Sequence, residues 1–149
     1  MKIYLATDHR GFELKEKIKL WLADWNFDFE DMGNDEFDPN DDYPDFVSLV
    51  AKQVAKEDNS RAIVLGASGQ GEAMVANRHR GVRAVVYYGG PKEIITLSRE
   101  HNNANVLSLG VAFLHDEQLI KSMIRLWLDT PFPNAQRHKR RIDKIDNQL

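Results

Sequence analysis

The sequence predicts an α/β fold: a Rossmann-like three-layer sandwich with a five-stranded parallel sheet and helices on both of its faces. Short apolar runs of strand length alternate with longer segments whose apolar residues recur at helical spacing. This alternation is repeated five times, which is typical of parallel strands joined by crossover helices. The 149 residues contain no internal repeat and no linker, so we expect a single domain that spans residues 1–149.

The first strand is expected at Lys2–Thr7, where consecutive apolar residues indicate burial on both faces of the sheet. Later strands are expected at Phe27–Met32, Arg61–Leu65, Val82–Tyr88 and Asn105–Leu109. Apolar residues at helical spacing predict helices at Gly11–Trp25, Asp45–Ala55, Gln70–His79, Lys92–Asn103 and Asp116–Leu128, the last of which is expected to be the final full helix. An acidic loop from Gly33 to Pro44 and a basic tail from Arg137 lie outside this pattern.

The composition excludes several classes of protein. The sequence contains no cysteine, which excludes disulfides, thiolate metal sites, iron–sulfur clusters and a cysteine nucleophile. A net charge of -3 and a pI near 5.9 argue against nucleic acid or an acidic membrane as partner. No apolar run reaches the roughly 20 residues of a membrane span, and the early charged residues are unlike a signal peptide, so we expect a cytoplasmic protein. Five histidines without a His-x-x-x-His pair or a carboxylate cluster predict no metal site.

The turn after the third predicted strand is the first candidate for a binding site. In a parallel sheet, ligands bind beyond the carboxyl ends of the strands, near the point where the strand order reverses. The segment Gly66–Glu72 lies there and leads into a helix. Gly69 and Gly71 let the backbone turn tightly and expose N–H groups as an anion site, although many such turns contain glycine for geometry alone. The turn matches neither the Walker loop nor the dinucleotide fingerprint.

Titratable residues near the predicted strand ends are candidates for acid–base chemistry. Glu72 lies four residues after Ser68, where a capping box would need three, so it is either a base beside the turn or a carboxylate stabilised by the helix dipole. Asp8 either caps the following helix or forms, with His9, an acid–base pair at the mouth of the sheet. His101 lies at the end of a helix, where the dipole also favours a cation.

The only dense basic cluster of the sequence lies in the tail. Arg137 and Arg141 are four residues apart and share one face if the tail is helical. One interpretation is a solvated charged tail, which is the commoner role of such runs. The other is a contact with a phosphate-bearing small molecule, which is a more economical partner for an acidic protein than nucleic acid.

Several motifs are long enough to be specific: Asp8-His9-x-Gly11-Phe12-Glu13-Leu14-Lys15, Asp42-Tyr43-Pro44-Asp45, Gly66–Glu72 with Ala76-Asn77, Arg99-Glu100-His101-Asn102-Asn103-Ala104-Asn105-Val106-Leu107 and Arg137-His138-x-Arg140-Arg141. Together they resemble the ribose-5-phosphate isomerase B family, which also contains the galactose-6-phosphate isomerase subunits. The resemblance covers essentially the whole chain. It implies interconversion of ribose 5-phosphate and ribulose 5-phosphate through an enediolate, without metal or cofactor. It also implies a homodimer or higher oligomer with active sites at the interface, the tail (about 133–149) docking on the partner subunit.

The resemblance further implies roles for individual residues. Ring opening is assigned to His101 with Asp8, and proton transfer to Glu72. The groups that would hold the enediolate are the amides of Ala67–Gly71, together with Ser68 and Asn102. Those that would contact the rest of the sugar phosphate are His9, Arg137, Arg141 and Tyr43.

The chain departs from the family pattern in three places. Many members of the family carry a cysteine base where this chain has Gly66. A second branch lacks that cysteine and resembles this chain in having glutamate at the position of Glu72. Because the chain contains no cysteine, Glu72 is the matching base. Ala112 stands where the family often has arginine, and we expect Arg10, in place of a small residue, to supply the lost phosphate contact. The loop Tyr88–Pro91 is longer than usual.

These departures leave other readings open. A six-carbon sugar phosphate, of the allose or galactose 6-phosphate type, is an alternative substrate. A non-catalytic nucleotide- or flavin-binding module shares the predicted fold. A receiver-type signalling domain is disfavoured, because it needs an acidic cluster after the first strand and a lysine after the fifth, where this chain has only Asp8 and Gly110-Val111-Ala112.

Overall fold

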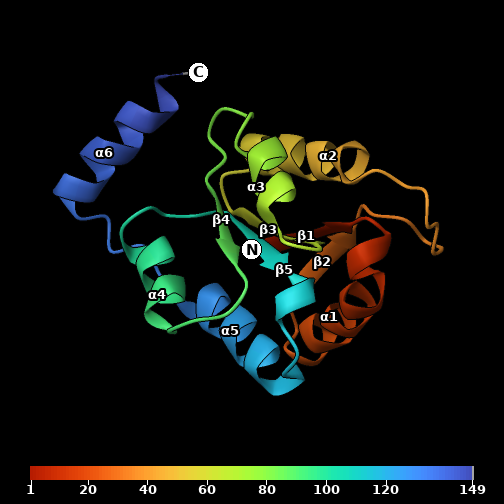
Figure 1. Cartoon of the computed structure of the whole chain (residues 1–149). Helices are drawn as coiled ribbons and strands as arrows, with labels where there is room; N and C mark the ends of the chain where they lie inside the picture. Colours follow the sequence, from red (N-terminus) through yellow and green to blue (C-terminus); the bar gives the residue numbers. More distant parts are fainter. Residues whose placement is uncertain (149) are drawn as a thin grey trace.

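The computed structural model describes residues 1–148 and places a five-stranded parallel sheet between two layers of helices (Figure 1). The strands are β1 (Lys2–Thr7), β2 (Asp28–Asp31), β3 (Ser60–Gly66), β4 (Ala84–Tyr87) and β5 (Val106–Gly110). Their order across the sheet is β2-β1-β3-β5-β4, and every neighbouring pair is parallel. The fold class predicted from the sequence is confirmed.

The helices are α1 (Phe12–Asp24), α2 (Tyr43–Lys56), α3 (Gln70–Ala76), α4 (Glu93–Glu100), α5 (Glu117–Asp129) and α6 (Gln136–Asp146), with 3₁₀ turns η1 (His9–Gly11) and η2 (Val111–Phe113). Helices α1, α4 and α5 cover one face of the sheet, and α2 and α3 cover the other (Figure 1). Strand β1 contributes Ile3 and Leu5 to the hydrophobic core under α1, α4 and α5, and Tyr4 and Ala6 to the core under α2 and α3. Burial on both faces therefore accounts for its continuous apolar run.

The strand order reverses beside β1. The chain leaves β1 in one direction to form β2, and continues on the other side of β1 with β3. The crevice beyond the carboxyl ends of β1 and β3 is therefore the expected ligand site of the fold. Gly11 lets the start of α1 approach this point, because a Cβ there would collide with Thr7 and lie 2.5 Å from the Leu65 Cβ.

The expectation that the helix ending near Leu128 is the last full one is wrong. Helix α6 follows it with 11 residues and stands apart from the two layers (Figure 1). It buries only His138 and Ile142, so the tail lacks the apolar periodicity on which a helix prediction depends. The expected helices at 70–79 and 92–103 are also shorter than predicted, because turns replace their ends. No helix within residues 1–148 is both long and apolar enough to cross a membrane.

Candidate active site

The segment after β1 presents Asp8 and His9 at the carboxyl edge of the sheet. Asp8 is buried and caps η1, because its Oδ1 accepts a hydrogen bond of 2.9 Å from the backbone N–H of Arg10. The sequence left a capping role and a catalytic role open for Asp8, and the structure shows that the cap exists. His9 contacts Asp41 of the acidic loop through both its backbone N–H (2.8 Å) and its ring Nδ1 (2.7 Å).

The turn after β3 is held in place by the end of β5. Gly69 has a positive φ of 74°, and a Cβ there would lie 3.0 Å from the backbone carbon of Leu109. The Ser108 hydroxyl donates to the Gly69 carbonyl (2.6 Å), and the Ala112 N–H donates to the Ala67 carbonyl (3.0 Å). Glycine is therefore required at position 69 both by the left-handed backbone and by the close approach of β5.

Glu72 projects from the first turn of α3 back toward the turn. It is 4% exposed, and its carboxylate occupies the space beside Gly66 where any side chain at that position would begin. Burial raises the pKa of the Glu72 carboxyl above its ordinary value; a hydrogen bond from its own backbone N–H opposes this shift, and the charge of Asp8 adds to it. A buried carboxylate whose pKa moves toward neutrality has the property that a general base needs.

Tyr43 brings the start of α2 against the same turn. A Cβ at Gly71 would lie 2.5 Å from the Tyr43 hydroxyl oxygen and 2.6 Å from its ring. Glycine at position 71 therefore lets the tyrosine lie directly on the backbone of α3. The structure thus brings Tyr43 together with the turn that contains Ser68 and Glu72.

The remaining predicted residues form a second group at the opposite edge of the sheet. His101 follows the last residue of α4, and its ring stacks on that of His138 at 4.3 Å and 14°. Arg137 donates through Nε to His138 Nε2 (3.1 Å), and the Asn102 carbonyl accepts from Arg83 (3.1 Å), which precedes β4. His138 was not among the residues singled out as functional, although it lies within one of the motifs.

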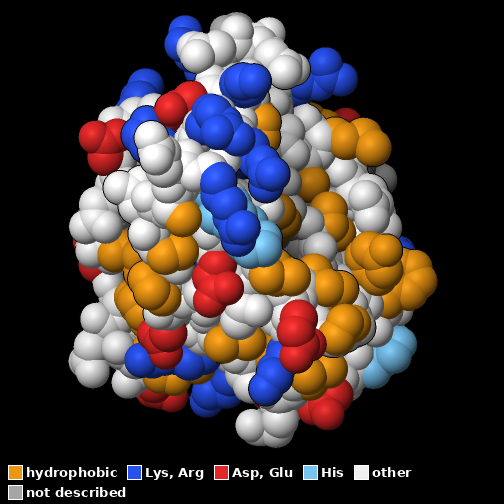
Figure 2. All heavy atoms as spheres, turned by 90° about the vertical axis from the view of Figure 1, so that its left-hand side faces the viewer, with side chains coloured by type: hydrophobic (Ala, Val, Ile, Leu, Met, Phe, Trp, Pro, Cys, Tyr) orange, Lys and Arg blue, Asp and Glu red, His pale blue; other side chains and the backbone are white. Residues whose placement is uncertain are grey.

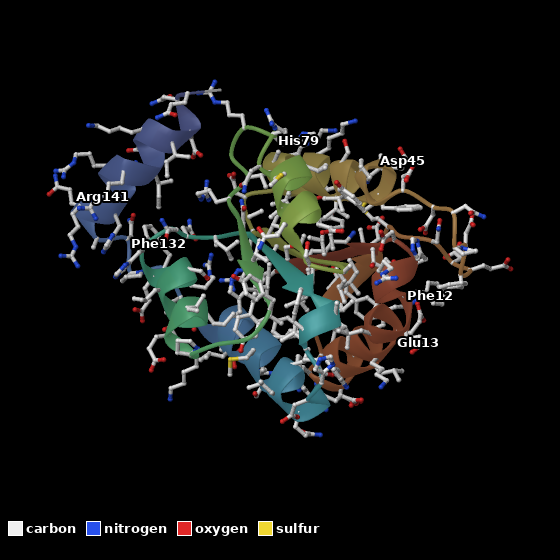
Figure 3. All side chains as sticks on the ribbon, in the orientation of Figure 1. Phe12, Glu13, Asp45, His79, Phe132 and Arg141 are labelled. Carbon is white, nitrogen blue, oxygen red and sulfur yellow. The ribbon has the colours of Figure 1, made fainter. Side chains whose placement is uncertain are left out.

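Helix α6 lies on the flank of the molecule away from α1 (Figure 1). In Figure 2 the Lys and Arg side chains of α6 form a basic stripe with a histidine beside its lower end. In Figure 3 Arg141 lies on the flank opposite Phe12. Phe12 begins α1, directly after the η1 turn that Asp8 caps. Strand β5 spans the sheet between Val106 and Gly110, about 13 Å at roughly 3.3 Å per residue. One chain therefore does not bring His101, Asn102, Arg137 and Arg141 to Asp8 and Glu72.

A hollow of about 410 Å³ is lined by His9, Arg10, Glu13, Phe37, Val111 and Ala112. Arg10 and Ala112 thus face the same space. The notion that Arg10 compensates for the missing arginine at position 112 is therefore spatially consistent.

The structure corrects the statement that no histidine lies in a carboxylate cluster. Asp8, His9 and Asp41 offer ligand atoms within 4.8 Å of one another, so these residues have the chemistry to hold a metal ion. Asp41 Oδ1 already accepts from His9, and Asp8 Oδ1 from Arg10. The cluster was missed because Asp41 is 32 residues from His9 in the sequence.

A second hollow, of about 340 Å³, lies at the amino-terminal edge and is lined in part by Arg61, Arg83 and Arg99. Burial lowers the pKa of Arg61 to about 10 and, with the neighbouring charges of Arg61 and Arg83, that of Arg99 to about 9. Both side chains donate to backbone carbonyls, Arg61 to that of Trp127 (2.8 Å) and Arg99 to that of Thr130 (3.2 Å). We therefore assign these arginines a structural role in tying α4, α5 and β3 together.

Known proteins resemble this chain over almost its whole length. Residues 3–145 match the family model of the Ribose/Galactose Isomerase family. Ribose-5-phosphate isomerase B of Mycolicibacterium paratuberculosis is 37% identical over 143 residues, which cover 96% of this chain and 88% of that protein.

Solved structures agree with this assignment. The crystal structure of ribose-5-phosphate isomerase B from Mycoplasma genitalium with bound ribulose 5-phosphate has a TM-score of 0.91 at 39% identity, covering 99% of this chain and 95% of that one. The ribose 5-phosphate isomerase from Thermotoga maritima has a TM-score of 0.87 at 37% identity, covering 98% and 97%. The chain therefore belongs to the ribose/galactose isomerase family, and the prediction from its motifs that it is an aldose–ketose isomerase is confirmed.

Proposed function

We propose that the chain interconverts ribose 5-phosphate and ribulose 5-phosphate without a metal ion, with Glu72 as the base. The observation that carries this proposal is the position of the Glu72 carboxylate, buried in the space beside Gly66 at the carboxyl edge of the sheet. The bound ribulose 5-phosphate in the relative from Mycoplasma genitalium supports the choice of a five-carbon substrate.

The reaction begins with the furanose form of the aldose. His101, with Asp8 opposite it, opens the ring by proton transfer to the ring oxygen and from the C1 hydroxyl. Glu72 then removes the proton from C2, which leaves an enediolate with its charge on O1. The proton of the C2 hydroxyl passes to O1, and Glu72 returns its own proton to C1, so that C2 becomes the carbonyl of the ketose. The amides of the 67–71 turn, with Ser68 and Asn102, stabilise the enediolate oxygens, because their donors are already oriented when negative charge develops. His9, Arg137 and Arg141 bind the phosphate, and Tyr43 lines the sugar pocket.

This mechanism requires residues from two copies of the chain. His101, Asn102, Arg137 and Arg141 lie at the edge opposite Glu72, so we infer that a partner subunit brings its own set to each site. Apolar residues are exposed beside them, Ile94 (45%) and Leu97 (43%) on α4 and Ile145 (47%) on α6. Figure 2 shows hydrophobic side chains flanking the basic stripe, which gives this face the composition of a subunit interface.

A hybrid experiment tests the shared site. Glu72→Gln protein and Arg137→Ala/Arg141→Ala protein are unfolded, mixed and refolded together. In a two-fold dimer with shared sites, each mixed dimer has one site with both defects and one with none. Because random pairing makes half of the dimers mixed, roughly a quarter of wild-type activity should return. A mixture that contains mixed dimers but is as inactive as its parents contradicts the shared site.

One set of assays tests which sugar phosphate is preferred and whether the reaction needs a metal ion. Ribose, allose and galactose phosphates are compared for ketose formation, with and without EDTA. We expect ribose 5-phosphate to be the preferred substrate and EDTA to leave the rate unchanged. A higher kcat/KM for a six-carbon sugar phosphate would favour the alternative substrate, and loss of activity that a divalent ion restores would contradict the metal-free mechanism. Bound flavin or nucleotide in the purified protein would favour a binding module.

A further inference from the structure

The ring of His9 is held on two sides. Asp41 Oδ1 lies 2.7 Å from His9 Nδ1 and 2.8 Å from the His9 backbone N, so one carboxylate oxygen fixes both the ring and the main chain. Phe37 packs edge-on against the ring, with centroids 6.3 Å apart. The imidazole keeps 26% of its side chain exposed and lines the 410 Å³ hollow beside Arg10.

Asp41 is itself anchored to the buried part of the protein. Its side chain is 6% exposed, and its Oδ2 accepts a hydrogen bond from Asn34 Nδ2 (2.5 Å). The Asn34 carbonyl accepts from Lys15 Nζ (2.8 Å), and Lys15 is fully buried and paired with Asp31 (2.5 Å). The two ends of the acidic loop are thus joined through Asn34 and Asp41, which keeps the carboxylate in place.

These contacts decide which ring nitrogen of His9 faces the ligand. An ionised carboxylate only accepts hydrogen bonds, so the nitrogen that contacts Asp41 must carry a proton. Nε2 is then the nitrogen left for a ligand in the hollow, and it donates to an anion such as phosphate in the imidazolium form, in which both ring nitrogens carry a proton. We propose that Asp41 is a positioning residue, which fixes the His9 imidazole through Nδ1 so that Nε2 faces the phosphate of the substrate.

This inference rests on the proposed function only in naming the phosphate as the ligand of His9. A histidine oriented by a carboxylate on its second nitrogen is a general device for fixing the tautomer and direction of the ring. No residue within 1–148 other than Asp41 forms a side-chain hydrogen bond or ion pair with the His9 ring nitrogens. Phe37 packs on the ring, but Asp41 supplies the polar contact that distinguishes Nδ1 from Nε2.

The test is Asp41→Asn, which keeps the size of the side chain and removes its charge. We expect KM for ribose 5-phosphate to rise about tenfold with kcat changed less than about threefold, because a charge-assisted hydrogen bond to a binding residue is lost. Asp35→Asn, at an exposed position of the same loop, is the matched control and should leave both constants unchanged. In a His9→Ala background, Asp41→Asn should have a much smaller effect on KM, because only the contact of residue 41 with the backbone N–H of residue 9 then remains.

A second readout does not depend on isomerase activity. In ¹⁵N-labelled protein we expect the His9 ring to show a protonated Nδ1 in the wild type, and its Nε2 signal to shift on titration with inorganic phosphate. In Asp41→Asn the preference for one ring nitrogen should weaken, because the amide oxygen accepts from Nδ1 without the negative charge, and phosphate should bind more weakly. If the wild type is inactive on every sugar phosphate, the proposed function fails while these spectra still decide the role of Asp41. An unchanged His9 spectrum in Asp41→Asn, or an equal loss of affinity with and without His9, overturns the inference. A His9 shift with a divalent ion but none with phosphate would instead indicate a metal site at Asp8, His9 and Asp41.

Discussion

Replacing Gly66 with alanine tests the central feature of the site. The added Cβ would collide with the Glu72 carboxylate, with the farther oxygen at 2.5 Å. Gly66 has no positive φ, so alanine introduces no backbone strain there. The smallest relief of the collision is a rotation of the flexible Glu72 side chain, which takes the carboxylate out of its place. We therefore expect Gly66→Ala to act on catalysis through Glu72, with a change in the free energy of unfolding below about 1 kcal/mol.

The expected loss of turnover follows from the role of a general base. Such a base contributes about 10²–10⁴-fold, so kcat for ribose 5-phosphate should fall by at least about 10²-fold. KM should change little, because the phosphate contacts are on other residues. Initial rates of ketose formation, with circular dichroism melts of both proteins, measure the two effects separately.

The Glu72→Gln variant supplies the control. If Gly66→Ala acts only by displacing the carboxylate, it should cause little further loss when Glu72 is already glutamine. Wild-type turnover in Gly66→Ala would refute the assignment of Glu72 as the base. Losses that multiply in the double variant would show that alanine at position 66 perturbs some other part of the site.

Two further predictions concern charge. The folded protein raises the pKa of Glu72 above 4.5, so the ionised carboxylate opposes folding, and Glu72→Gln should raise the Tm at about pH 7. Each pKa unit of that upward shift corresponds to about 1.4 kcal/mol of stability gained by Glu72→Gln. This gain should disappear as the pH falls below 4.5, where the carboxyl is protonated in both the folded and the unfolded protein. A Tm of Glu72→Gln below that of the wild type at about pH 7 would contradict the prediction. Arg10→Ala should raise KM far more than it lowers kcat. Adding Ala112→Arg to that variant should bring KM partly back toward the wild-type value, since both positions line one hollow. An unchanged KM in Arg10→Ala would show that Arg10 is only a surface charge.

The strand–helix pattern predicts much of this architecture, because the spacing of apolar residues in the sequence follows from which side chains are buried. The run from Ile3 to Ala6 is continuous since β1 is buried on both faces. The rule for carboxyl ends directs attention to Asp8 and Glu72, and the structure places both beyond the carboxyl ends of β1 and β3. The position of His101 was also open to prediction. A crossover helix runs antiparallel to the strands, so the residue after α4 must lie at the amino-terminal edge, away from Asp8.

Other features have no local signal. Asp41 is one of many acidic residues in an irregular loop, and nothing in its neighbours indicates that it, rather than Asp38 or Asp42, contacts His9. Helix α6 is similarly hidden, because a helix that buries only two side chains on its own chain lacks the apolar stripe that reveals an amphipathic helix.

The residues at positions 66 and 72 depend on each other. The carboxylate of Glu72 and a side chain at position 66 cannot both occupy the space between the end of β3 and the start of α3. In family members with cysteine in place of Gly66, the sulfur would begin from this same point. Under the proposed mechanism, two different bases would then reach the substrate from one place in the fold, and Gly66 is the residue that leaves room for the longer side chain of Glu72. The fold would in that case specify where the proton is moved, while the residue that moves it could change as long as the other position carries no competing side chain.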